Sequence, residues 1–139
     1  RKFHEAKIKN NNEVICWGSG KPLREFLFVE DFAEASIFAL KKWDPNLVKS
    51  PKDNEGKSLY WLNVGSEFEI SIFDLAQKIA EISGFKGKII WDESKPDGTP
   101  RKKLDNTHLK QIGWKAITDL DCGIRKTINN FLKENEIEN

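Results

Sequence analysis

The chain has 139 residues, of which 38% are hydrophobic and 32% charged, and its 23 basic and 22 acidic side chains leave a net charge of +1. This length suits about one domain with a modest core. The balanced charge argues against a dedicated nucleic-acid-binding or membrane-surface protein, which would carry a clear basic excess. There is no apolar run that could cross a bilayer and no signal-peptide pattern, so we expect a cytoplasmic protein.

The start of the chain alternates helical and extended segments. Residues 1–9 predict a helix already under way at its first residue, which suggests that further residues precede it. Residues 13–16 predict a strand because they include β-branched side chains. A turn over residues 17–23 separates them from a second extended segment at 25–29. Residues 30–43 then carry an apolar stripe with the period of a helix.

The middle of the chain begins with a loop. Residues 44–57 contain prolines, a glycine and many charges, which indicates a mobile surface loop. Residues 59–64 predict a buried strand. Ser71 followed by Asp74 forms a capping-box-like signal that predicts the start of a helix. Gly84 suits the position just after the end of that helix.

The last part predicts a strand at residues 88–91, a short helix at 107–112 and a final helix from Thr118, with a polar tail over 133–139 that frays. These short strands and long connections predict an α/β, α+β-like fragment over residues 1–139, as a single domain whose helices cover a few strand pairs. Because no glycine-rich turn joins a strand to a helix, a complete dinucleotide-binding domain is not expected.

The clearest candidate site is the turn that follows the first strand. Gly18, Gly20 and Pro22 favour a turn, and Arg24 follows it with a planar, permanently charged group that suits a phosphate. Trp17 could lie flat against a base or a sugar. These residues predict a site for a nucleotide or a nucleotide-sugar diphosphate. The alternative is a surface loop with an unpaired arginine and a tryptophan that covers the core.

A second loop, residues 92–105, repeats this theme around a Pro96-Asp97-Gly98 turn. It is either a second anion-contacting loop or a solvated loop whose charges balance. Its cations are Lys95, Arg101, Lys102 and Lys103.

Other chemistry is not indicated. The two histidines, His4 and His108, and the two cysteines, Cys16 and Cys122, lack ligand spacing, so no metal site is expected. The cysteines predict free buried thiols rather than a disulfide. There is no nucleophile elbow and no phosphate-binding P-loop. The residues alone therefore predict an anion site and no catalytic residues.

Several motifs together resemble one enzyme family. They are RKFHEA at 1–6, WGSGKPLREFL at 17–27, DFAEAS at 31–36, LNVG at 62–65, SKPDGTPRK at 94–102 and LKQIGW at 109–114. Over nearly its whole length the chain resembles the GDP-L-fucose synthases, which belong to the extended short-chain dehydrogenases/reductases. The run at 94–102 is the most specific of these motifs.

The resemblance implies that this chain is the C-terminal, substrate-binding part of such an enzyme. In the family, an N-terminal Rossmann domain binds NADP(H) and carries the Ser, Tyr and Lys of the reductase site, and the Cys and His of epimerisation also lie upstream of this region. The chain would therefore hold no cofactor and no catalytic residue, because Cys16 and His4 do not stand at the matching positions. Family members tend to be homodimers.

The resemblance also implies the substrate contacts. Arg24 matches the arginine on the GDP diphosphate, and Trp17 matches a tryptophan that touches the substrate. Lys2 stands where the family often has an arginine, so the charge is kept but the bidentate fork is lost. Lys102 matches a lysine near the nucleotide, and Lys88 stands at a further basic position for the nucleotide.

The implied activity of the whole enzyme is conversion of GDP-4-keto-6-deoxy-D-mannose to GDP-L-fucose by 3,5-epimerisation and NADPH-dependent 4-reduction; the part alone would be inactive. One alternative is the corresponding part of another nucleotide-sugar epimerase, reductase or dehydratase. The other is a stand-alone, non-catalytic nucleotide-binding or interaction module. If the chain is part of a larger enzyme, we expect an exposed apolar patch where the partner domain binds. If it is a stand-alone module, we expect a hydrophilic surface there.

Overall fold

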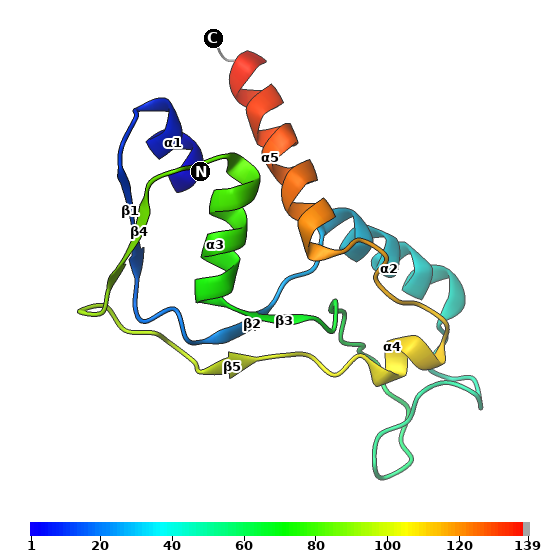
Figure 1. The fold of residues 1–139 in the computed structure, drawn as a ribbon. Coiled ribbons are helices and arrows are strands. Elements are labelled where there is room, and N and C mark those ends of the chain that lie inside the picture. Colours follow the sequence, from blue (N-terminus) through cyan, green and yellow to red (C-terminus); the bar gives the residue numbers. More distant parts are fainter. Residues whose placement is uncertain (138–139) are drawn as a thin grey trace. The chain divides into compact units, whose positions relative to one another are not determined.

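The computed structural model describes residues 1–137 (Figure 1). The chain divides into two compact units, which are described separately. Unit 1 comprises Arg1–Arg24, Glu69–Lys102 and Leu120–Asn139, and unit 2 comprises Glu25–Phe68 and Lys103–Asp119. The expectation of a single domain over the whole chain stays a prediction.

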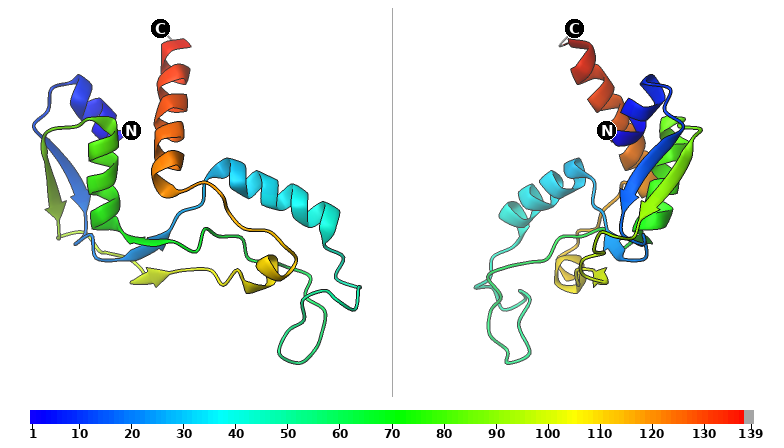
Figure 2. Two further views of the ribbon diagram at one scale, coloured as in Figure 1. Left: turned by 45° about the vertical axis from the view of Figure 1, so that its right-hand side comes forward. Right: turned by 90° about the vertical axis from the view of Figure 1, so that its left-hand side faces the viewer.

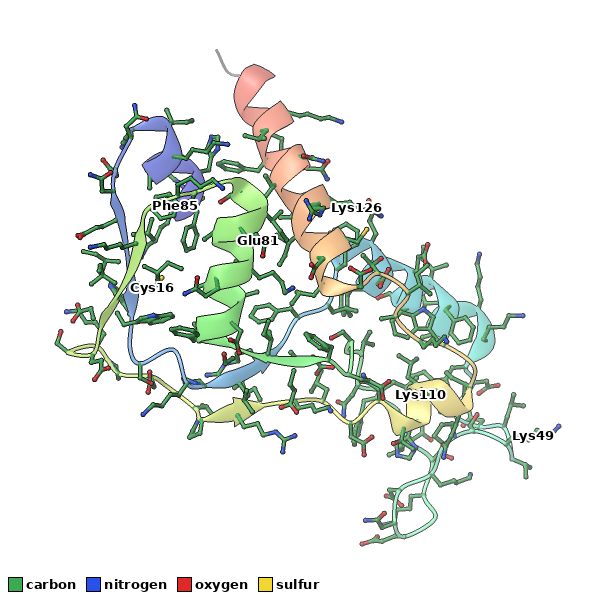
Figure 3. The ribbon with its side chains drawn as sticks, viewed as in Figure 1. Cys16, Lys49, Glu81, Phe85, Lys110 and Lys126 are labelled. Atoms are coloured by element: carbon green, nitrogen blue, oxygen red, sulfur yellow. The ribbon has the colours of Figure 1, made fainter. Side chains whose placement is uncertain are left out.

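Unit 1 is built on a parallel pair of strands, β1 (Glu13–Trp17) and β4 (Lys88–Asp92). Helices α1 (Lys2–Ile8) and α3 (Ile72–Ser83) supply the core that packs on this pair. Figure 3 shows Cys16 and Phe85 between the strands and these helices. The residues of this buried cluster are Phe3, Ala6, Val14, Ala76, Ala80 and Phe85.

Helix α3 has the ends that the sequence predicts. The Ser71 hydroxyl accepts a hydrogen bond from the Asp74 N–H at 2.9 Å and donates to the Asp74 carboxylate at 2.6 Å. A cap of this kind contributes about 1 kcal/mol. At the other end, Gly84 adopts the left-handed conformation with φ +72°. The capping prediction is confirmed.

A second small sheet in the chain has the strand order β3-β2-β5, made of Glu69–Ser71, Leu23–Glu25 and Arg101–Lys102. Strands β2 and β5 run parallel. The predicted extended segment at 25–29 is wrong in position, because β2 begins two residues earlier and helix α2 already begins at Val29. Strands as short as β3 and β5 are too short to show an alternating pattern, so they could not be predicted from hydrophobic periodicity.

The last helix, α5 (Leu120–Ile137), packs beside α3 in unit 1. Lys78 on α3 forms an ion pair with Asp121 on α5 at 2.7 Å. The helix begins two residues after the predicted Thr118. Residues 133–137 of the tail that we expect to fray are helical, and residues 138–139 lie outside the described part.

Unit 2 contains α2 (Val29–Lys42) and the short α4 (Thr107–Gln111), which Figure 2 shows from two further sides. The buried Asp31 side chain of α2 accepts hydrogen bonds from the Ile117 and Thr118 N–H groups and from the Thr118 hydroxyl. This carboxylate ties α2 to the segment that follows α4.

The helix predicted at residues 30–43 is present as α2, and its apolar side chains are only partly buried. Ala35 is fully buried, but other apolar side chains of the helix remain exposed. They are Val29 at 69%, Phe32 at 53%, Ile37 at 52% and Leu40 at 88%.

The predicted buried strand at residues 59–64 is wrong. This segment has no regular secondary structure, and although Leu59 is buried, Tyr60 and Trp61 are 71% and 61% exposed. A strand needs a neighbour to pair its backbone groups, and within the described residues of unit 2 no segment pairs with it. Residues 44–57 are irregular, as predicted, with one bridge between Lys52 and Ser58; their mobility stays a prediction.

Both cysteines are free, as predicted, but they are not both buried. Cys16 is half-buried and Cys122 is exposed on α5. A thiol on the solvent side of an amphipathic helix cannot be told from a core thiol by type alone, because cysteine is commonly buried. None of the helices in residues 1–137 combines the length and the apolar character needed to cross a membrane.

Candidate functional site

Four of the five predicted site residues lie in two groups on unit 1. The first group surrounds Trp17, at the end of β1, whose side chain is 67% exposed. The Lys2 ammonium lies 5.7 Å from the Trp17 ring centroid and donates to the Ile15 carbonyl at 3.2 Å. The Lys95 ammonium lies 6.0 Å from the same ring. Cations at these distances are attracted to the ring, so this corner presents an aromatic surface with two positive charges.

The turn after Trp17 is confirmed, and its backbone is held on several sides. Gly18 and Gly20 have φ +79° and +74°, values that side chains rarely allow. A Cβ on Gly20 would lie 2.8 Å from the Trp91 ring, so the turn is packed closely onto the core of unit 1. The Gly20 carbonyl accepts from the Phe73 N–H at 2.8 Å, at the start of α3.

The second group contains Arg24 and Lys102, which are partners in the parallel register of β2 and β5. The Arg24 Nη1 donates to the neighbouring Leu23 carbonyl at 2.7 Å, and no carboxylate among the described residues forms an ion pair with Arg24. Gly98 lies beside it, since a Cβ there would be 3.9 Å from Nη2. The guanidinium therefore keeps most of its donors available for an anion.

Arg101 differs from its neighbours in the second loop. Its guanidinium forms a bidentate pair with Glu69, through Nε at 2.7 Å and Nη2 at 2.6 Å. This charge is already compensated within the sheet. Of the loop's predicted cations, Lys95 and Lys102 are thus the ones that the structure places with Trp17 and Arg24 respectively.

A pair of hydrogen bonds joins the loop of residues 17–23 to that of residues 94–100. The Asp97 carboxylate accepts from the Ser19 N–H at 2.6 Å and from the Ser19 hydroxyl at 2.7 Å. These bonds, the hydroxyl first, lower the pKa of Asp97 below its ordinary value. The carboxylate is therefore ionised near neutral pH and its bonds are charge-assisted. We call this contact the Ser19–Asp97 clamp.

Lys88 lies apart from the other predicted residues. The register pairs Lys88 with Glu13, whereas Trp17 pairs with Asp92 at the other end of the same two strands. At about 3.3 Å per residue, the four-residue offset places Lys88 about 13 Å from the level of Trp17 along the strands. The structure does not bring it together with the other four, so its role stays a prediction.

Cys16 and His4, two side chains of potentially reactive type, make packing contacts in unit 1. Partial burial raises the pKa of the Cys16 thiol, which disfavours the reactive thiolate, and the His4 ring packs edge-on against Phe131 at 5.5 Å. Within residues 1–137, no group of histidine, cysteine and acidic side chains could hold a metal ion. What remains is an exposed aromatic ring beside several cations, which suits an anionic ligand with a flat or apolar portion.

Sequence reasoning missed three participants: Ser19, Lys95 as a neighbour of Trp17, and Asp97 as a partner of the first loop. Ser19 and Asp97, which the clamp joins, are 78 positions apart in the sequence. The available signals were the small residue between two glycines and the Pro-Asp-Gly turn. Neither signal indicates that the two turns form hydrogen bonds with each other.

The chain is similar in sequence to several known proteins. Residues 1–49 match the model of the NAD dependent epimerase/dehydratase family. The chain is 43% identical over 136 residues to a GDP-L-fucose synthase of Escherichia coli K12, covering 98% of this chain and 41% of that protein. It is 44% identical over 133 residues to a probable GDP-L-fucose synthase of rice, covering 96% of this chain and 37% of that protein.

The chain is also similar to a solved structure. A GDP-L-fucose synthetase from Naegleria fowleri bound to NADP matches with a TM-score of 0.76 at 28% identity, over 97% of this chain and 39% of that one. The chain thus spans about two fifths of the length of the relatives that it matches.

Proposed function

We propose that this chain, which is homologous to the GDP-L-fucose synthases over almost its whole length, is the GDP-sugar-binding, C-terminal part of such an enzyme. The whole enzyme would convert GDP-4-keto-6-deoxy-D-mannose to GDP-L-fucose by 3,5-epimerisation and NADPH-dependent 4-reduction. The observation that carries the proposal is that Arg24, which forms no ion pair with a described carboxylate and pairs in register with Lys102, follows the same turn as the exposed Trp17.

Each group has a part in binding. Arg24 and Lys102 would hold the diphosphate, because a guanidinium fork and an ammonium both form charge-assisted bonds with phosphate oxygens. Trp17, with Lys2 beside it, would contact the sugar or the base on its open face. A firm grip on the unreactive nucleotide fixes where the sugar carbons lie, which is how remote binding energy assists a reaction.

The proposal places NADP(H) on residues outside this chain. The cofactor supplies the hydride for the reduction, but the glycine turn at Gly18 and Gly20 leads into strand β2 and not into a helix N-terminus. It therefore does not fit the pyrophosphate cradle of a dinucleotide-binding turn. We assign the described residues no contact with the cofactor and no catalytic step.

The exposed apolar side chains of unit 2 favour the interpretation that another domain packs against this unit. The exposed side chains of α2, together with Tyr60 and Trp61 in a segment whose sequence favours a strand, form the kind of surface that the enzyme-part interpretation predicts. A stand-alone binding module would not expose them. We propose that a Rossmann domain preceding this chain covers them in the whole enzyme, a homodimer of the cytoplasm.

A titration with two nucleotides tests the proposed substrate class. We expect this chain to bind GDP more tightly than UDP in isothermal titration calorimetry, because the proposed substrate is a GDP-sugar. A preference for UDP would contradict the fucose assignment and favour another nucleotide-sugar enzyme. Equal binding of inorganic pyrophosphate would reduce the site to a general anion site.

A further inference from the structure

The ion pair between Glu69 and Arg101 joins two strands that are not neighbours in the second sheet. The strand order β3-β2-β5 places β2 between them, with Glu69 on β3 and Arg101 on β5. The guanidinium donates to the two carboxylate oxygens from Nε at 2.7 Å and from Nη2 at 2.6 Å. Because adjacent strands lie about 4.8 Å apart, the pair bridges about twice that separation across β2. It therefore fixes the two edge strands relative to each other.

The register of β2 and β5 connects this ion pair to the proposed diphosphate contacts. Leu23 pairs with Arg101, and Arg24 pairs with Lys102. Since successive side chains of a strand point to opposite faces of a sheet, the Glu69–Arg101 pair lies on one face and the two cations Arg24 and Lys102 lie on the other. The pair therefore holds β5 against β2 from the face opposite to these two cations.

The backbone of β5 has few bonds of its own to β2. Strand β5 has two residues, and their register partners are Leu23 and Arg24. The Leu23 N–H donates to the Pro100 carbonyl at 2.9 Å, just before the strand begins. The register of a strand is weakly specified where both of its faces are polar, as in this exposed pair of an arginine and a lysine. A side-chain contact that fixes Arg101 is therefore expected to contribute to the register.

Geometry and burial distinguish this ion pair from an ordinary surface pair. The Glu69 side chain is only 15% exposed, whereas that of Arg101 is 64% exposed. The Arg1–Glu5 pair of α1, by contrast, has one short contact between side chains that are 79% and 42% exposed. Exposed pairs with a single contact contribute little, whereas a bidentate pair has a defined geometry. The Glu69 carboxylate is thus suited to hold Arg101 in one place.

We infer that Glu69 is a positioning residue for the proposed diphosphate contacts, which acts through Arg101 to hold Lys102 in register with Arg24. The inference rests on the proposed function for its ligand, GDP. Charge alone predicts the opposite effect, because removal of a carboxylate near these cations strengthens their attraction for an anion. Loss of positioning weakens binding, so the sign of the change separates the two explanations.

The test compares Glu69→Gln with Glu81→Gln by calorimetry with GDP. Glu81 is an exposed glutamate of α3 in the same unit, so its substitution removes the same charge away from the sheet (Figure 3). We expect Glu69→Gln to weaken GDP binding by about 5- to 10-fold, because the amide loses the charge-assisted bidentate contact. Glu81→Gln should leave GDP binding unchanged. Unchanged or tighter binding in Glu69→Gln would overturn the inference.

A second variant tests the same ion pair from its other side. Arg101→Lys keeps the positive charge but cannot form the bidentate contact, so it should weaken GDP binding by a smaller factor. Adding it to Glu69→Gln should cost little more, because both substitutions break one contact. Fully additive losses would contradict an action of Glu69 through Arg101.

A measurement without GDP separates the positioning from the proposed function. In the ligand-free chain, Glu69→Gln should shift the Arg24 Nε resonance and the Lys102 amide resonance, and it should leave the amide of the buried Val14 in place. Unchanged Arg24 and Lys102 resonances would overturn the inference whether or not GDP binds. If they shift but the unsubstituted chain binds no GDP, the positioning is supported and the proposed function is contradicted.

Discussion

Replacing Arg24 by alanine is expected to weaken GDP binding by about 1.5–3 kcal/mol, or roughly 10- to 150-fold, the usual loss for charge-assisted phosphate bonds. Arg24 is half-buried and forms no ion pair with a described carboxylate, so no ion pair has to break when the ligand binds. Isothermal titration calorimetry with GDP measures the change directly.

Two further variants show whether the loss of GDP affinity is due to the bidentate guanidinium or to the removal of any positive charge. Arg24→Lys keeps the charge and loses the bidentate geometry, so it should bind GDP with intermediate affinity. Arg125→Ala removes an exposed arginine from α5 and should leave the affinity unchanged. If Arg24→Ala binds GDP as the unchanged chain does, Arg24 is not part of the site.

The second large effect is on stability. Asp31→Ala is expected to lower the free energy of unfolding by about 3 kcal/mol, because it removes a buried carboxylate that accepts three hydrogen bonds. Asp31 is 3% exposed and accepts from the Ile117 N–H at 3.1 Å, the Thr118 N–H at 2.9 Å and the Thr118 hydroxyl at 2.7 Å. Urea denaturation followed by circular dichroism gives the difference.

The matched control is Asp53→Ala, in the same unit. Asp53 also accepts backbone hydrogen bonds, from Glu55 and Lys57, but it is exposed and water can replace it. Its loss should cost under about 1 kcal/mol. Equal effects of the two variants on the unfolding free energy would contradict the assignment of Asp31 as the buried tie of α2.

The local signals of the sequence predicted the helices and the turn well. Ser71 with Asp74 placed the start of α3, and the glycines after Trp17 placed a turn whose φ angles only glycine readily adopts. These signals succeed because capping and turn formation depend on residues a few positions apart. The pair Arg24 and Lys102 followed from the resemblance, and its two cations are neighbours in the parallel register.

The features that could not be predicted from the sequence depend on contacts between residues far apart along the chain. Residues 59–64 have the composition of a strand, but composition does not supply a neighbouring strand, and the segment is irregular. Lys88 has the same charge as Lys102, yet the register of β1 and β4 places Lys88 at the opposite end of these strands from Trp17. The clamp was missed for the same reason, since Ser19 and Asp97 are ordinary turn residues until the fold brings them together.

The most direct test of the account is to map GDP onto the chain by amide NMR during a titration. The account predicts shifts of the Trp17 indole, the Arg24 side chain and the amides of residues 18–20, 97–99 and 101–102, with little change at Lys88 or in residues 44–57. Shifts confined to unit 2, or none at saturating GDP, would contradict the claim that these two loops form a GDP-sugar site.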